Sequence, residues 1–387
     1  MGALRIGLAF SRSRAYGRGF CEGFSSYTGV RHDWRLEMLP PCAPYSGYDG
    51  IVAHVMDDAG AERLVASGVP AVADFYRAPA AQYPLAQAVP DHAAIGRLAA
   101  DLFRERGFSN YAFCGYDGIL FSDQRRDGFA GALAESGFEC MSYKCGRKAL
   151  AQFDQRVILS EELTPNAPDS RELGRWLESL PRPCALFCCH DLRAFQALSA
   201  ARNAGLGVPG DIAILGVDND ALVCNFTYPR LSTVDGNAFG VGLAAARLLD
   251  DVMEGRSARD AVVKVPPLGV VLHASTDMFT YSSPIVNEAL RFIRRSLPLN
   301  PTSSDVFAHI GKSHTVVEKA FRAELGTTVH AEIQRLRMVE AKRLLTTTKL
   351  SLSDVARKSG FTTARYFAHT FRQAFGVPPS AFRESAR

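Results

Sequence analysis

The sequence predicts two α/β lobes followed by an all-α domain with two helix-turn-helix motifs. Short apolar strands alternate with helices from residue 4 to residue 274, and this pattern restarts after about residue 118. Such alternation is typical of parallel α/β sheets. The last hundred residues instead carry two helix-turn-helix patterns in tandem. A chain of 387 residues suits two or three domains, and we expect one at residues 1–278 and the other at 279–387.

The composition is that of a well-buried globular protein, with 47% hydrophobic residues and no long low-complexity tract. The first twenty residues lack the apolar run of a secretory signal, and no stretch is long enough to span a membrane. Nine cysteines without framework spacing fit a reducing compartment better than a disulfide scaffold. We therefore expect a cytoplasmic protein that has no membrane partner.

The charge is divided unevenly along the chain. Residues 281–387 carry 17 Lys or Arg and 8 Asp or Glu, whereas the other 280 residues carry 27 and 32. A basic surplus in a helix-turn-helix segment favours binding to the phosphates of nucleic acid. The alternative is a helical bundle with a solvated basic face.

The α/β part is predicted element by element from its apolar runs. In the first lobe we expect strands at 5–10, 34–39, 50–54 and 69–74, with helices at 17–27 and 59–66. In the second we expect strands at 111–115, 184–189 and 212–217, with helices at 124–136 and 193–204. Crossovers between the lobes are expected near 115–118, 232–235 and 264–267. Ligands of such sheets bind beyond the carboxyl ends of the strands, which here means between the lobes.

Five segments of this part resemble a known family in both order and spacing. They are residues 91–115, 125–133, 190–191, 212–219 and 229–234. The family is that of the lactose and galactose repressors and the periplasmic sugar-binding proteins, and the resemblance covers nearly all of residues 4–276. It implies a periplasmic-binding-protein-like sensor domain that binds a small sugar between its lobes.

The resemblance implies that Arg125, Asp191 and Asp218 line the sugar site. Charged, planar side chains of this kind make several hydrogen bonds to neighbouring hydroxyl groups. Each residue also has a structural alternative. Arg125 could pair with Asp127 on the surface, Asp191 could cap a helix, and Asp218 could brace the hinge.

Further candidates follow the first expected strand. Ser11, Arg14 and Tyr16 are expected to contact the ligand. Phe10 and Phe75 are possible stacking platforms for a sugar, or else core residues.

Neither a metal site nor catalysis is well supported. Cys184, Cys188, Cys189 and His190 lie in an apolar strand, where Cys188 and Cys189 point to opposite faces, so we expect core residues rather than ligands.

The pairs 57–58 and 161–162 contain adjacent carboxylates, which on a helix point about 100° apart and usually form a solvated face. There is no Gly-x-Ser-x-Gly elbow or phosphate-binding loop. We therefore expect no cofactor and no enzymatic activity.

The first helix-turn-helix motif is expected at about 303–325, with its turn at Gly311. Val317 and Phe321 should face inward. The outward positions are His314, Thr315, Glu318, Lys319 and Arg322. A linker helix of about 24 Å is expected at 330–345, which could place two recognition helices in successive major-groove segments about 34 Å apart.

The second motif is expected at about 353–375. Ser353 should cap its first helix, Gly360 should end that helix, and Thr362 or Thr363 should start the next. The inward face is expected to hold Tyr366, Phe367, Thr370, Phe371 and Phe375. The opposite face holds Thr363, Ala364, Arg365, Ala368, His369 and Arg372. Arg365 and His369 are expected to reach base edges, and Arg372 a phosphate.

This second motif resembles the signature of the arabinose operon regulator (AraC-type) family. The matching residues are Gly360-Phe361, Tyr366-Phe367, Phe371-Arg372, and Gly376 with Pro379. That family often has Arg at the position of His369, so the base read there is open. The resemblance implies a double-stranded DNA operator as partner.

A periplasmic-binding-protein-like sensor followed by an AraC-type reader resembles the family of xylose operon activators. This order implies a transcription activator whose effector is D-xylose or a related pentose. It also implies a homodimer and a contact with RNA polymerase. The alternatives are a cytoplasmic sugar-binding protein and a repressor of the same fold that responds to another carbohydrate.

Overall fold

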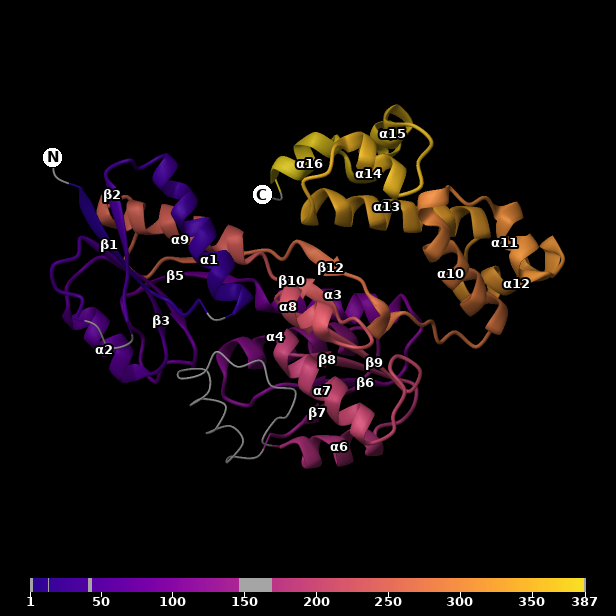
Figure 1. Cartoon of the computed structure of the whole chain (residues 1–387), viewed down its shortest axis with the longest axis horizontal. Helices are drawn as coiled ribbons and strands as arrows, with labels where there is room; N and C mark the ends of the chain where they lie inside the picture. The colour runs from indigo at the N-terminus through magenta and orange to yellow at the C-terminus, as the bar shows by residue number, and fades with distance from the viewer. Residues whose placement is uncertain (1–2, 13, 41–43, 146–168, 386–387) are drawn as a thin grey trace.

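The computed structural model describes residues 3–12, 14–40, 44–145 and 169–385 of the chain. Two α/β lobes, each built around a six-stranded sheet, are followed by a domain made of helices (Figure 1). The predicted fold class is confirmed. In the described part of the chain, no helix is both long enough and apolar enough to cross a membrane.

The first lobe contains a parallel sheet with strand order β11-β5-β4-β3-β1-β2. Its strands are β1 (Leu4–Ala9), β2 (Trp34–Met38), β3 (Gly50–Val55), β4 (Ala71–Phe75), β5 (Ala86–Pro90) and β11 (Val262–Val265). Its helices are α1 (Ala15–Ser26), α2 (Asp58–Ala66) and α9 (Ala238–Met253), with the short η1 (Tyr27–Gly29) after α1.

The second lobe has strand order β12-β10-β9-β8-β6-β7, and β12 alone runs antiparallel to its neighbour. Its strands are β6 (Tyr111–Cys114), β7 (Cys140–Tyr143), β8 (Cys184–Cys188), β9 (Ile212–Val217), β10 (Ser232–Asp235) and β12 (Gly269–Val271). Its helices are α3 (His92–Arg104), α4 (Leu120–Ala134), α6 (Ser170–Ser179), α7 (Asp191–Asn203) and α8 (Ala221–Phe226), with the short η2 (Ala274–Thr276) at the end.

Helices cover both faces of each sheet, so the central strands are buried on both sides. Every residue of β8 and β9 is buried. Cys188 and Cys189 pack into different core clusters, as their predicted opposite directions require, and Cys184 is buried as well. Within the described ranges, no three His, Cys, Asp or Glu side chains lie close enough together to hold a metal ion.

The chain crosses between the lobes three times. Two crossovers, after Asp235 and after Val265, lie close to the predicted ones. The prediction near 115–118 is wrong, because β5 still belongs to the first sheet and α3 already packs on α4 of the second lobe. The first crossover is therefore the short link between Pro90 and His92.

Two glycines set the close approach of α3 to α4. A Cβ atom on Gly96 would lie 2.4 Å from the carbonyl oxygen of Arg125, and one on Gly128 would lie 2.5 Å from that of Ala93. Any larger side chain would push the two helices apart. This packing holds the middle of α4, with Arg125, against the start of α3 at the first crossover.

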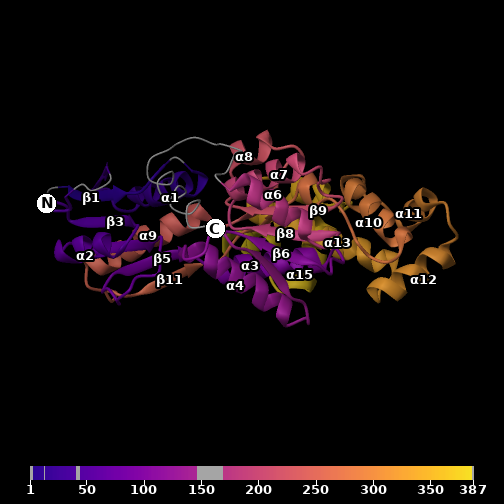
Figure 2. The ribbon, with the colours of Figure 1, turned by 90° about the horizontal axis from the view of Figure 1, so that it is seen from below.

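The helical domain lies along one side of the second lobe, with α10–α12 at the end of the molecule farthest from the first lobe (Figures 1 and 2). It contains α10 (Pro284–Ser296), η3 (Leu297–Leu299), α11 (Ser303–Ile310), α12 (His314–Leu325), α13 (Val329–Thr347), α14 (Leu352–Lys358), α15 (Ala364–Phe375) and α16 (Pro379–Ser385). It has two cores, one around Val317 and Phe321 and one around Phe367 and Phe371. The linker helix α13 contributes to both cores.

The second motif departs from its prediction at two points. Ser351, not Ser353, caps α14, because its hydroxyl accepts a hydrogen bond from the Asp354 backbone N–H at 3.1 Å. The inward face of α15 is narrower than expected: Phe367 and Phe371 are fully buried, but Tyr366 and Phe375 remain 46% and 36% exposed. The helix buries only the stripe that meets α13, α14 and α16.

Candidate functional site

A cavity of about 500 Å³ lies between the two lobes, at the carboxyl ends of their strands. Sites for small molecules commonly have this size and place. The first lobe contributes residues at the ends of β1 to β4 and in the segments that follow them, and the second lobe contributes His92, Phe121, Arg125, His190 and Asp218. Five of the six predicted ligand contacts line this cavity: Ser11, Arg14, Tyr16, Arg125 and Asp218.

Arg125 stands in the second-lobe wall of the cavity and is only 3% exposed. Its Nε lies 3.3 Å from Nδ1 of His92, one terminal nitrogen donates to the carbonyl oxygen of Cys189, and the other lies 3.4 Å from Oδ1 of Asp218. The alternative pairing with Asp127 is wrong, because Arg126 makes that ion pair. Buried Arg125 is therefore placed to donate to an acceptor in the cavity.

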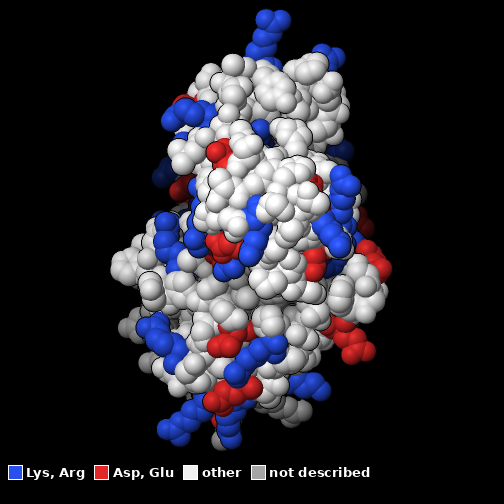
Figure 3. All heavy atoms as spheres, turned by 90° about the vertical axis from the view of Figure 1, so that its right-hand side faces the viewer, with Lys and Arg blue, Asp and Glu red and all other residues white. Residues whose placement is uncertain are grey.

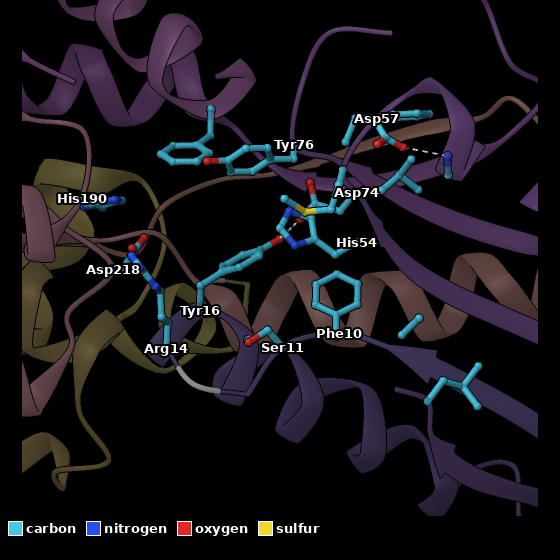
Figure 4. A pocket seen from close by; sticks show the side chains of 18 of the residues that line it. Phe10, Ser11, Arg14, Tyr16, His54, Asp57, Asp74, Tyr76, His190 and Asp218 are labelled. Carbon is cyan, nitrogen blue, oxygen red and sulfur yellow. Dashed lines mark hydrogen bonds between the residues drawn. The ribbon is translucent and has the colours of Figure 1, made fainter. Parts of the chain in front are cut away.

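Asp218 follows β9 and faces the cavity near Arg14 (Figure 4). Its φ of 106° is rare for a residue with a side chain, and such strain is concentrated at functional sites. Burial raises the pKa of Asp218 to about 6, although the positive charges of Arg125 and Arg14 act in the opposite direction. This carboxyl group therefore holds its proton more tightly than an ordinary aspartate does.

Asp191 does not line the cavity. One of its carboxylate oxygens accepts from the hydroxyl of Thr233 at 2.6 Å, and the other accepts from the backbone N–H of Asp220 at 2.8 Å. It therefore holds the loop that carries Asp218. Its neighbour His190 lines the cavity and also caps α7, since Nδ1 accepts from the Arg193 backbone N–H.

A polar cluster that the sequence analysis missed lies in the first-lobe wall. His54 on β3 and Asp74 on β4 are register partners in the parallel sheet, so their side chains share one face. The hydroxyl of Tyr16 donates to Asp74 at 2.9 Å, and the three side chains converge in Figure 4. Burial raises the pKa of Asp74, while His54 and the Tyr16 hydrogen bond lower it. Each of these two polar residues interrupts an otherwise apolar strand, which is the signal that could have revealed them.

Aromatic rings form much of the remaining surface. Phe10 stacks on Phe20 at 4.1 Å and on His54 at 5.6 Å, and the ring of Tyr76 meets His54 edge-on. Phe10 and Phe75 are both largely buried, yet both line the cavity. Hydroxyl-binding groups beside aromatic faces suit a ligand with polar edges and an apolar C–H surface.

The predicted DNA-reading residues are exposed on α12 and α15. On α12 these are His314, Thr315, Lys319 and Arg322, and on α15 they are Thr363, Arg365, His369 and Arg372. The Thr363 hydroxyl caps α15 by accepting from the Tyr366 backbone N–H at 3.1 Å. Among the residues that the structure describes, the side chains of Arg365 and Arg372 make no hydrogen bond or ion pair. Both are therefore available to another molecule.

Basic side chains are spread over this end of the molecule. Figure 3 shows Lys and Arg projecting at its upper end and along both sides, with acidic side chains between them. On this face, basic side chains are therefore spread out rather than gathered into one patch.

The structure separates the adjacent carboxylates of Asp57 and Asp58. Asp57 caps α2 by accepting from the Gly60 N–H, whereas Asp58 accepts from the Ala80 N–H and the Tyr83 hydroxyl. They form no pair for acid–base chemistry. The pair Glu161 and Glu162 lies outside the described residues.

Comparisons with known proteins match both parts of the chain. The family described as periplasmic binding protein-like domain matches residues 80–276, and the helix-turn-helix domain matches residues 307–385. The xylose operon regulatory protein of Haemophilus influenzae is 25% identical over 397 aligned residues, covering 98% of each chain. That of Escherichia coli K12 is 26% identical over 394, covering 98% of this chain and 97% of the relative.

A solved structure of the xylose-binding transcription activator xylR superposes over 98% of both chains with a TM-score of 0.59 and 24% identity. The cellobiose complex of the transcriptional regulator CelR matches 71% of this chain and 85% of its own, with a TM-score of 0.55 and 19% identity. These two likenesses show the fold. The two family matches and the full-length relatives confirm the resemblances predicted from the sequence.

Proposed function

Because the chain belongs to the family of periplasmic binding protein-like domains and carries a helix-turn-helix domain behind it, we propose that it is a DNA-binding transcription regulator controlled by a small sugar. One observation carries the proposal: a single chain joins a polar and aromatic cavity between two lobes to two helices with exposed basic side chains, among them Arg365 and Arg372, which have no partner among the described residues. A transport-type sugar-binding protein has no use for those helices.

The effector we propose is D-xylose or a related pentose. The full-length relatives are named for the xylose operon, which supports this choice. The cavity chemistry is compatible, because Asp218 and Arg125 on one wall and Asp74 and His54 on the other offer donors and acceptors to hydroxyls at both edges of a sugar ring.

The wider setting is part of the same proposal. The regulator acts in the cytoplasm as a homodimer on a double-stranded operator, and it activates transcription through a contact with RNA polymerase. It has no catalytic role, which is supported by relatives that are themselves regulators.

A melting-temperature survey over pentoses and hexoses tests the effector. A sugar at about a hundredfold its Kd should stabilise the folded chain by about 2.7 kcal/mol. We expect the largest rise in Tm with D-xylose or another pentose. A panel in which no sugar changes the Tm would contradict the proposed function, and a response to a hexose alone would correct the effector.

The affinity for the sugar is expected to fall as the pH is lowered through about 6. The carboxylate of Asp218, whose pKa burial raises to about 6, is the form that accepts hydrogen bonds from hydroxyls. A ligand that prefers the ionised form binds more tightly above this pKa and loses up to about tenfold in affinity per pH unit below it.

Titration calorimetry between pH 5 and 8 measures this dependence, with Asp218→Asn as the control. The variant should bind weakly at every pH. A residual slope in the variant would point to Asp74, whose pKa burial also raises. A pH-independent affinity of the parent chain would refute the role of Asp218.

A further inference from the structure

The helical domain is fastened to the second lobe at the end of α3. The backbone N–H of Thr280 donates to the carbonyl oxygen of Arg106 at 2.8 Å, and the hydroxyl of Tyr281 donates to that of Glu105 at 2.7 Å. The carboxylate of Glu105 also forms an ion pair with Arg335 of α13 at 3.3 Å. These contacts tie both the connecting segment and the linker helix to one lobe.

Toward the first lobe, the helical domain instead faces a second cavity of about 840 Å³. Its walls are α9 of the first lobe, the crossover segment 265–270, part of α3 and the side of α13. In the described part of the chain, no hydrogen bond or ion pair joins α9 to the helical domain. Among the described residues, hydrogen bonds and an ion pair therefore attach the helical domain to the second lobe, whereas none attaches it to α9 of the first lobe.

The crossovers connect the two cavities. His92, at the first crossover, lines the ligand cavity. Asn237 at the second crossover and residues 265–269 at the third line the second cavity. When lobes rotate about such a hinge, a narrowing on one side is accompanied by a widening on the other. Because the helical domain stays with the second lobe, closure on a ligand must move α9 relative to α13.

We propose that the cavity between α9 and α13 couples sugar binding to the position of the DNA-reading helices. This inference rests on the proposed function. Closure of the lobes on the sugar draws α9 away from α13, and lobe opening brings the two helices together. Since α13 contributes to the cores of both helix-turn-helix motifs, a contact with α9 biases the position of both.

Charged side chains on the two walls supply the contacts that differ between the states. Arg247 and Asp251 of α9 face the cavity, as do Glu340 and Lys342 of α13. On its own side of the cavity, Asp251 pairs with Arg256 and Glu340 pairs with Arg343. A narrower cavity additionally allows Arg247 to approach Glu340, and Lys342 to approach Asp251, from the opposite wall. A ligand can shift the equilibrium only through contacts that differ between the two lobe states, and these contacts meet that condition.

Distance measurements give the direction of the movement. Spin labels at Arg247→Cys and Lys342→Cys, read by pulsed electron resonance, should move apart when D-xylose is added. Labels placed across the fastened side, at Glu105→Cys and Arg335→Cys, should keep their distance. An unchanged or shorter distance across the cavity would overturn the proposal.

Cross-linking tests whether the movement matters. The same two cysteine pairs are joined by a bis-maleimide. To prevent unwanted cross-links, Ser first replaces three native cysteines that are not buried, Cys21, Cys140 and Cys145. Ser also replaces Cys42, which lies outside the described residues. As a control, each double-cysteine variant is also treated with a maleimide that has one reactive group, so that both cysteines are blocked but not joined. This control shows whether the chain still folds and binds D-xylose.

Cross-linking α9 to α13 should weaken D-xylose binding about tenfold or more, because it opposes lobe closure. Cross-linking Glu105→Cys to Arg335→Cys should leave the affinity unchanged.

The outcomes separate this inference from the function on which it rests. If the variants with blocked cysteines bind D-xylose and the α9–α13 cross-link changes nothing, the coupling is refuted while the sugar-controlled regulator stands. Equal losses with both cross-links also refute it. If the parent chain binds neither D-xylose nor any other sugar of the panel, the proposed function fails and the coupling fails with it.

Discussion

Replacing Arg125 by Ala is expected to weaken sugar binding by about ten- to a hundredfold and to remove the sugar-induced rise in Tm. Arg125 is buried, and its guanidinium spans the carboxylate of Asp218, the ring of His92 and the carbonyl of Cys189. Losing a charged hydrogen-bond donor in such a place typically costs about 1.5 to 3 kcal/mol. The variant also removes one of the two cationic neighbours of Asp218 and leaves only Arg14, which disfavours the ionised form of that carboxyl.

The next residue provides a matched control. Arg126 lies on the same helix but pairs with Asp117, Asp123 and Asp127 outside the cavity. Arg126→Ala should therefore bind sugar like the parent chain, as titration calorimetry can show. DNA binding without sugar should persist in both variants. Sugar binding by Arg125→Ala at the parent affinity would show that the cavity between the lobes is not the effector site.

Replacing Arg365 by Ala is expected to lower operator affinity by about 1 to 3 kcal/mol and to relax the preference at one base pair. Arg365 lies in the first turn of α15, is exposed, and has no hydrogen-bond or ion-pair partner among the described residues. Its side chain is therefore free to donate to a guanine edge when α15 enters the major groove.

Arg372, two turns further along the same helix, gives the contrasting result. Arg372→Ala should weaken all sequences alike and reduce the slope of log affinity against log salt concentration by about one unit. Binding of both variants to a library of single-base operator changes at two salt concentrations distinguishes them. An unchanged base preference in Arg365→Ala, with a lower Tm, would mean that this residue only supports the fold.

The sequence predicted part of each wall of the cavity, and Ser11, Arg14 and Tyr16 of the first lobe line it as expected. Arg125 and Asp218 stand in segments whose spacing resembles a known family, and both line the cavity. Asp191 stands in such a segment too, but its side chain turns away from the cavity while that of its neighbour His190 turns into it. His190 is the extended N-cap of α7 and Asp191 is the first residue of that helix, so their side chains leave the backbone in different directions. A motif located to within one residue therefore does not decide which side chain meets the ligand.

The polar cluster of the first lobe depends on information that a single sequence does not contain. His54 and Asp74 are twenty residues apart and meet only because β3 and β4 pair in one register. Neighbouring strands and their register follow from the packing of the whole sheet. The same limit explains the misplaced first crossover, since β5 and the edge strand β11 pair side by side in the first sheet although they lie far apart in the chain.

Binding of the purified full-length chain to DNA from upstream of its own gene, measured by fluorescence anisotropy with and without D-xylose, is the most direct test of sugar-controlled DNA recognition. We expect this fragment to be preferred over a scrambled duplex, and D-xylose to change its Kd by about fivefold or more. The response should disappear in Arg125→Ala. Two results would contradict sugar-controlled DNA recognition. One is equal affinity for the two duplexes, and the other is a Kd for the upstream fragment that neither D-xylose nor any other sugar of the panel changes.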